Sequence, residues 1–403
     1  MEDILINTIP KINKDVIIHN RDDEYIVAFR NNNCHLKIDS KVYQLINCIG
    51  KNRNVKQIVS EFNNHFEPKI NDEFAYDILF NKLGYYNIIE SDVEKFDTGK
   101  SPSYLKLNTI IINNKINKII TKPFLFLFRH TLLKLIVIFC FITILLTIVF
   151  KYSDLLNYIK QITPQYLFIY LAIMIASSVL HEIGHSAATY KFGGKHGGIG
   201  IGFYLFTPVL YSDVSDAWKF NTSKRIIVNL AGIYFELIFS TLVILVALIT
   251  GIKTLLIIPT IIFLKTLLNL NPFFRTDGYW ILSDLMKAPS LRLESNQILK
   301  LFFIKPKSID FTKRNIFFII YAIISNGFIF VFLTTIFIIN PNSLITFPND
   351  LYTFLTELMS NKYKFDLVNF SKLLIPFTFY LLLLRLIFPL LKKINKINSN
   401  NNA

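Results

Sequence analysis

Six apolar stretches constrain this chain more than any other feature, because each has the roughly 20 residues that a helix needs to cross a bilayer. They cover residues 131–150, 165–187, 226–250, 254–274, 315–339 and 372–391. Lipid offers the backbone no hydrogen bonds, so a spanning segment must be a helix or part of a closed barrel. Hydrophobic residues make up 52% of the chain and charged residues only 18%, below their usual share in soluble domains. We therefore predict a multi-pass α-helical membrane protein with about six transmembrane helices.

The basic residues predict its orientation. Lys and Arg gather before the first stretch and in the loops at 188–225 and 275–314, whereas the intervening loops, including 340–371, are poorer in positive charge. Cytoplasmic loops of membrane proteins carry this excess. We therefore expect a protein of the cell membrane with its N- and C-termini in the cytoplasm. The same pattern accounts for the net charge of +15, so no nucleic-acid partner is expected.

A histidine pair lies near the end of the second apolar stretch, in the sequence His181-Glu182-Ile183-Gly184-His185. Side chains four residues apart project from one face of a helix, so both histidines can bind one Zn²⁺ while Glu182 lies beside the water of a catalytic site. The alternative is a helix whose histidines bond neighbouring carbonyls. Ionisable groups inside a membrane are costly and functional by default. We expect a zinc site about 9 Å from the cytoplasmic end of this helix.

A catalytic zinc site needs a third protein ligand, and Asp277 is the best candidate. It follows the fourth apolar stretch, between Pro272 and Gly278, which both interrupt helices. A non-helical turn there could bend Asp277 toward the metal at the membrane depth of His185. The alternative is an ordinary turn aspartate before a glycine.

The histidine pair and the later element Asn269-x-x-Pro272-x-x-x-x-Asp277-Gly278 resemble the site-2 protease family of intramembrane zinc metallopeptidases, over residues 165–285. The resemblance implies His181, His185 and Asp277 as ligands of one zinc ion and Glu182 as general acid and base. It also implies that Asn269 helps to position the substrate or the transition state. The chain departs from the family at residues 273–276, where many members carry further prolines and an apolar residue.

Residues 197–206, between the two motifs, are rich in glycine and then in aromatic residues, which suits a strand or re-entrant backbone. Such backbone persists at membrane depth only where it lines a cavity or pairs with something. We expect a peptide substrate to pair there as an added strand, with Gly200 and Gly202 at the substrate site. The alternative is a flexible loop tip. The neighbouring His196 is either another ligand or a loop histidine.

The third apolar stretch contains Asn229, the small pair Ala231-Gly232 and Glu236. Small residues let another helix approach closely, and Glu236 would be costly against lipid. We expect Asn229 and Glu236 to face the site and to support substrate or transition-state binding. Two roles stay open for them, namely support of the metal ligands and bonding to another helix.

Residues 1–95 are polar enough for a separate soluble domain, joined through a linker at 96–122 to the membrane domain at 123–403. Strands are predicted at residues 24–29 and 34–38. Three helices should follow, the last of them stopped by Gly84. The expected N-caps of the first two are Asp39 and Asn54, and the third helix is expected from Asn71 to Leu83. Short strands followed by three short helices predict an α+β winged-helix-like domain.

Residues 15–92 resemble the PqqD-like domains that recognise the leader peptides of ribosomally made precursors. A winged helix could instead bind DNA, but its third helix carries Asp72, Glu73 and Asp77 against only Lys82, which suits phosphate poorly. In the resembling family the leader adds to the sheet as a strand. This implies leader binding at Tyr25, Val27 and Phe29 on the strand edge and against the helix from Asn71.

Together these features predict a zinc metalloendopeptidase that cleaves a peptide bond within the membrane. Its expected partners are the lipid bilayer and a peptide or protein substrate, above all a leader-bearing precursor peptide. Two alternatives stay open. One is a regulatory intramembrane protease that releases a membrane-anchored regulator, and the other is a non-enzymatic transporter or immunity protein that kept a zinc-like motif.

Overall fold

The computed structural model describes residues 7–21, 24–29, 32–50, 53–90, 106–159, 164–204, 207–306, 309–334 and 342–359, with 373, 376–377 and 379–380. The chain divides into two compact units. The first unit contains residues 1–104 together with the short segments 192–196 and 214–225, the latter including the 3-10 helix η3 (Ser215–Lys219). The second unit contains the remainder.

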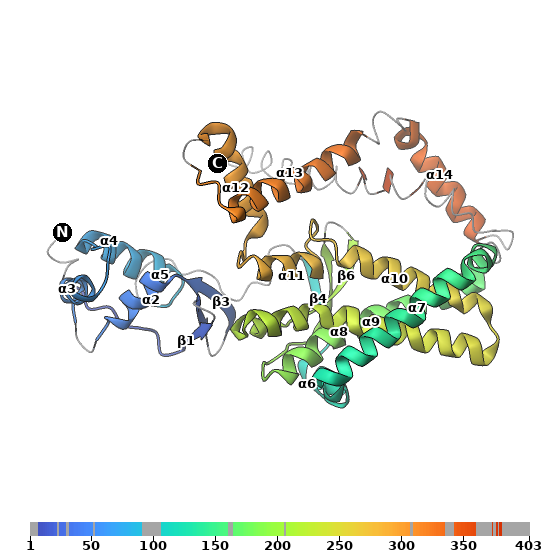
Figure 1. Ribbon diagram of the computed structural model, residues 1–403, viewed down its shortest axis with the longest axis horizontal. Helices are drawn as coiled ribbons and strands as arrows, with labels where there is room; N and C mark the ends of the chain where they lie inside the picture. Colours follow the sequence, from blue (N-terminus) through green and yellow to red (C-terminus); the bar gives the residue numbers. More distant parts are fainter. Residues whose placement is uncertain are drawn as a thin grey trace, which may run out of the picture. The chain divides into compact units, whose positions relative to one another are not determined.

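A three-stranded antiparallel sheet and several short helices form the N-terminal part of the first unit (Figure 1). The strands lie in the order β1 (Val16–Arg21), β2 (Glu24–Phe29) and β3 (Asn32–Ile38). β1 is not among the predicted strands. The helices are α2 (Ser40–Asn47), α3 (Val55–His65), α4 (Asp72–Tyr76), the π-helix η1 (Asp77–Lys82) and α5 (Leu83–Tyr85).

Polar side chains begin three of these helices, and the sequence predicts two of these caps, Asp39 and Asn54. The side chains of Asp39, Asn54 and Asn71 each accept a backbone N–H of the following turn, which satisfies a donor that the helix itself leaves unpaired. Gly84 does not stop the last helix, which ends at Tyr85. The reversal falls instead at Asn87, whose φ of 59° is in the left-handed region that asparagine tolerates.

β2 is the central strand of this sheet, and this corrects the expected position of leader binding. β1 and β3 pair along its two edges, so no further strand can add to it. Val27 is completely buried in the core, and the ring of Tyr25 stacks on that of Tyr43 with centroids 3.7 Å apart. The backbone from Tyr25 to Phe29 therefore cannot receive a leader strand. Such a strand could pair only with the outer edge of β1 or β3.

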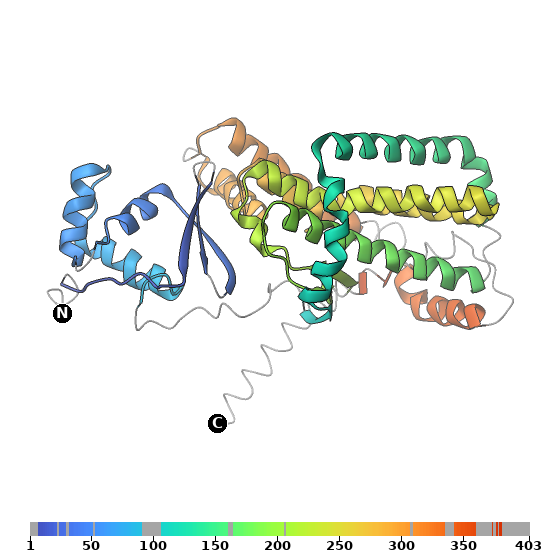
Figure 2. The same ribbon diagram turned by 90° about the horizontal axis from the view of Figure 1, so that it is seen from below.

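Three long helices of the second unit correspond to the first three predicted spans. α7 (His130–Ile159), α8 (Pro164–Lys191) and α9 (Thr222–Thr250) each contain a segment long and apolar enough to cross a membrane. They lie alongside one another (Figure 2) and share an apolar cluster. That cluster includes Ile144 of α7, Tyr170 of α8 and Ile244 of α9.

The fourth predicted span is not one continuous helix. Its residues form the 3-10 helix η4 (Lys253–Leu256), the helix α10 (Ile257–Asn269) and an irregular turn. α10 has 13 residues. At 1.5 Å per residue it is about 20 Å long, shorter than a hydrocarbon core of about 30 Å.

The remaining helices follow in the second unit. α11 (Asp277–Leu285) and α12 (Leu291–Ile304) precede α13 (Lys313–Thr334), which covers most of the fifth predicted span. α14 (Asn342–Met359) lies within the expected loop at 340–371. The sixth predicted span, 372–391, lies almost wholly outside the described residues. Beyond α7, α8 and α9, the count of six spans therefore stays a prediction.

A second antiparallel sheet belongs to the same unit, with the order β4 (Lys106–Ile112), β5 (Ile199–Tyr204) and β6 (Thr207–Ser212). β4 leads into α6 (Asn114–Thr121) and the 3-10 helix η2 (Lys122–Phe128). Residues 106–121 were expected in the linker, yet β4 pairs with β5 and α6 packs against α8. The reason is Asn117, a completely buried residue whose amide donates to Oγ of Ser186 at 3.0 Å and to the Gly197 carbonyl at 2.9 Å.

Candidate metal centre

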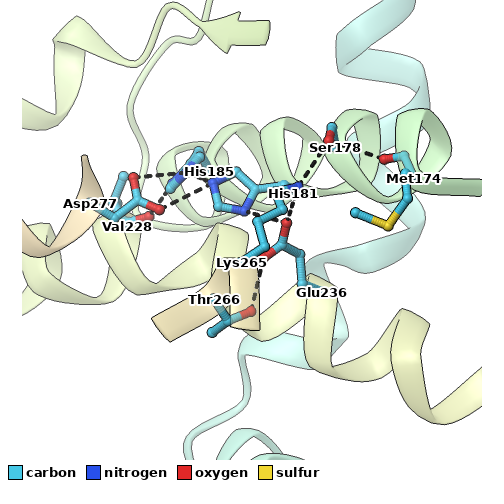
Figure 3. A network of polar contacts seen from close by, with 9 residues as sticks. All are labelled: Met174, Ser178, His181, His185, Val228, Glu236, Lys265, Thr266 and Asp277. Atoms are coloured by element: carbon cyan, nitrogen blue, oxygen red, sulfur yellow. Dashed lines mark hydrogen bonds and ion pairs between the residues drawn. The ribbon is translucent and has the colours of Figure 1, made fainter. Parts of the chain in front are cut away.

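Two histidines and an aspartate of the second unit face one another (Figure 3). His181 and His185 lie one turn apart on α8, and Asp277 is the first residue of α11. Nε2 of His181 is 3.0 Å from Nε2 of His185 and 3.1 Å from Oδ2 of Asp277, and Nε2 of His185 is 3.5 Å from Oδ1 of Asp277. The histidines are 6% and 7% exposed and the Asp277 side chain 17%. These three residues are called the triad below.

The hydrogen bonds around the triad leave lone pairs pointing at one another. Nδ1 of His185 is 2.7 Å from the Val228 carbonyl, which can only accept, so Nδ1 carries the proton and Nε2 presents a lone pair. Nδ1 of His181 lies 3.4 Å from a Glu236 carboxylate oxygen, which favours the same tautomer. Oδ2 of Asp277 is buried and makes no hydrogen bond to the residues that the structure describes. Facing lone pairs repel unless a cation lies between them.

The donor set fits zinc. Two imidazole nitrogens and a carboxylate are a ligand set of catalytic zinc sites, which keep a fourth position open. Ligands about 2.0–2.1 Å from a tetrahedral zinc are about 3.3 Å from one another, close to the separations of 3.0, 3.1 and 3.5 Å in the triad. The triad can therefore hold one Zn²⁺ with little movement.

The turn before α11 places Asp277. Asp277 begins this helix rather than lying in a non-helical turn as the sequence suggests. The hydroxyl of Thr276 donates to the Asn271 carbonyl at 3.1 Å, and the hydroxyl of Tyr321 on α13 donates to the Pro272 carbonyl at 2.9 Å. A Cβ on Gly278 would lie 2.1 Å from the Leu270 carbonyl oxygen. Only glycine therefore lets the turn close this tightly before the aspartate.

α9 packs closely against the histidine helix, as its small residues predict. A Cβ added to Gly184 would lie 2.4 Å from the Ala231 carbonyl oxygen, and one added to Gly232 would lie 2.5 Å from Nε2 of His181. The small residues thus confirm the expected close approach. Glu236, one turn beyond Gly232, is completely buried and faces His181.

The other predicted site residues lie in different positions. Glu182 is buried at 9% exposure beside His181 on α8. Asn229 donates to Oδ2 of Asp284 at 3.2 Å, which links α9 to α11, the helix that carries Asp277. Asn269 ends α10, is half-buried and makes no hydrogen bond to the triad among the described residues. Two roles were left open for Asn229, support of the metal ligands and bonding to another helix. The contact with Asp284 is of the second kind.

Gly200 and Gly202 lie in β5, which forms the strand that the sequence suggests but occupies the centre of its sheet. β4 and β6 occupy both of its edges, so a substrate strand cannot add to β5. A Cβ on Gly200 would lie 2.7 Å from the Thr109 carbonyl oxygen and from the Tyr211 ring. The packing of the sheet therefore accounts for this glycine, and β4 and β6 are the edge strands of this sheet.

Lys265 of α10 lies beside the triad but is not among the predicted site residues. Its Nζ lies 2.6 Å from Oε1 of Glu236 and donates to Oγ of Ser178 at 2.9 Å (Figure 3). A signal existed, because Lys265 is a lone charge in the apolar stretch 254–274, and charges in such stretches are costly.

Comparison with known proteins gives one relative. Over 111 residues the chain is 32% identical to the "Putative peptide zinc metalloprotease protein YydH" of Bacillus subtilis (strain 168). The match covers 27% of this chain and 44% of that protein, so the chain spans less than half the length of the relative. No family model matches the chain, and no solved structure does. The chain is thus distantly related to a protein that is named as a zinc metalloprotease.

Proposed function

We propose that this protein is an intramembrane zinc metalloendopeptidase of the site-2 protease type that processes a ribosomally made precursor peptide. The single observation that carries the proposal is the buried triad, whose lone pairs converge between apolar helices. The distant similarity of the chain to a protein named as a peptide zinc metalloprotease supports the same chemistry. A zinc site with three protein ligands and a neighbouring glutamate is typical of enzymes that hydrolyse peptide bonds.

The chemistry divides between the ion and the chain. Zinc, when bound, makes water a nucleophile near neutral pH and polarises the scissile carbonyl. Glu182 accepts a proton from the attacking water and delivers it to the leaving amine, so that the amide bond breaks and one water is consumed. His181, His185 and Asp277 hold the ion. The resemblance to site-2 proteases assigns Asn269 to positioning of the substrate.

We assign substrate recognition to strand edges. The substrate would extend the second sheet as an added strand beside β4 or β6, the strands at its two edges, and this pairing would hold its scissile segment extended. A leader would extend the first sheet at the outer edge of β1 or β3. In this proposal both termini are cytoplasmic, the chain has about six spans, and the active site opens toward the cytoplasm, where precursor peptides are made.

Cleavage assays with the full chain in lipid nanodiscs test the proposal. Three substrates are compared: a soluble precursor with its leader, the same precursor without the leader, and a single-span membrane-anchored protein. We expect zinc-dependent cleavage of the first, a marked loss with the second, and no cleavage by a Glu182→Gln variant. Cleavage confined to the membrane-anchored substrate would support a regulatory protease instead. A purified chain that holds no zinc and cleaves nothing would leave the transporter or immunity interpretation.

A further inference from the structure

Lys265 makes an unusual set of contacts for a charge on an apolar helix. Its ammonium group lies 2.6 Å from Oε1 of Glu236 on α9 and donates to the hydroxyl of Ser178 on α8 at 2.9 Å. Ser178 stands one turn before His181 and donates in turn to the Met174 carbonyl at 3.1 Å. The Lys265 side chain is 30% exposed. One side chain of α10 thus links α8 and α9 beside the triad.

The Glu236 carboxylate is held from both sides. It is completely buried. Oε1 lies between Lys265 and Nδ1 of His181, at 2.6 and 3.4 Å, while Oε2 accepts from the hydroxyl of Thr266 at 3.1 Å. An unpaired carboxylate would be very costly in this position. The contacts from α10 therefore compensate the charge of Glu236. They also hold the carboxylate so that Oε1 faces Nδ1 of His181.

We propose that Lys265 is a positioning residue for the zinc site, acting through Glu236 on the ring of His181. The inference rests on the proposed zinc site. Carboxylates that hold the outer nitrogen of a zinc-bound histidine fix its tautomer and ring orientation, and their loss costs about 10–100-fold in metal affinity. Lys265 extends that support by one further residue.

The charges of the region favour this role. Zinc and Lys265 together bring three positive charges, which equal the three carboxylates of Glu182, Glu236 and Asp277. Without Lys265 the buried cluster would carry a net negative charge, and the completely buried carboxylate of Glu236 would lose its positive partner. An ion pair that merely joined α9 to α10 would stabilise the fold without changing the affinity for zinc.

Zinc affinity of the full chain in nanodiscs separates the two roles. We would measure the dissociation constant by competition with a chelator for the wild type and for Lys265→Met, Lys265→Arg and Glu236→Gln. Lys253→Met is the control, because Lys253 is an exposed lysine just before α10. Lys265→Met and Glu236→Gln should each weaken zinc binding by about 10–100-fold. Arginine should retain most of the affinity, and the control should match the wild type.

Two further measurements keep the test decisive. In the double variant Glu236→Gln/Lys265→Met the loss should be no greater than for Glu236→Gln alone, because both residues act on one path. The visible spectrum of the cobalt-loaded protein should change in both single variants, which a purely structural role would not produce. If Lys265→Met does not fold, Lys265→Gln replaces it, because glutamine also removes the charge while it can still donate to Ser178.

Wild-type affinity in Lys265→Met and Glu236→Gln, or fully additive losses in the double variant, would overturn the inference and leave the zinc site standing. A wild-type chain that binds no zinc and cleaves no substrate would instead overturn the proposed function.

Discussion

Gly232 of α9 lies directly against the imidazole of His181, so closely that a Cβ at this position would be 2.5 Å from Nε2 of the ring. Val228 and Glu236 lie one turn before and one turn after Gly232 on the same helix. The Val228 carbonyl accepts from His185, and the Glu236 carboxylate faces Nδ1 of His181. One stripe of α9 therefore fixes the tautomer or the position of both histidines.

Substitution of this glycine should damage the metal site. In Gly232→Ala the new methyl group must displace the His181 ring, and overpacking of this kind costs about 1–3 kcal/mol. We expect lower zinc content at limiting zinc and a lower melting temperature. Gly327→Ala is the control, since a Cβ there meets nothing within 4 Å on α13. Equal zinc binding by the two variants would contradict the role assigned to α9.

Glu182 should be needed for cleavage but not for metal binding. Glu182→Gln keeps the size of the side chain and removes the proton acceptor, so the rate of peptide cleavage should fall by about 10²–10⁴-fold. The triad is unchanged, so the zinc content should equal that of the wild type. Elemental analysis and a cleavage assay on the same preparation check both statements. A variant that cleaves at the wild-type rate would sink the assigned mechanism.

Removal of the metal should abolish activity reversibly. A strong chelator should leave the protein inactive, and added zinc should restore it. His181→Ala, His185→Ala and Asp277→Ala should each lose zinc, because three ligands cannot be reduced to two without a large loss of affinity. His196→Ala is the control, a nearby histidine in sequence that is not part of the triad. Loss of zinc in His196→Ala alone would mean that the ligand set is wrong.

Tyr321 should matter for the turn that carries Asp277. Tyr321→Phe removes the hydroxyl that donates to the Pro272 carbonyl at 2.9 Å, which should lower stability by about 1 kcal/mol and weaken zinc binding. Tyr380→Phe removes a comparable hydroxyl, which donates to the Leu344 carbonyl at 2.9 Å. It should affect stability without affecting zinc affinity. The two variants are compared by thermal unfolding with and without zinc.

Local patterns predicted much of the fold. The helix N-caps at Asp39 and Asn54 and the three long apolar helices follow from neighbouring residues alone. Strand order did not follow, because pairing depends on distant residues. Lys106, for example, pairs with Phe203, which places β5 at the centre of its sheet and moves the expected substrate edge away from Gly200 and Gly202.

For the site, the sequence by itself determined that His181 and His185 share one face of an apolar helix with Glu182 beside them, since helical periodicity is a local property. Only the tertiary structure decided which carboxylates meet them. Asp277 lies close to both histidines because a tight turn precedes it. Glu236 faces His181, and Lys265 of α10 pairs with Glu236. These contacts depend on the rotation and packing of one helix against another, which spacing along the chain does not specify.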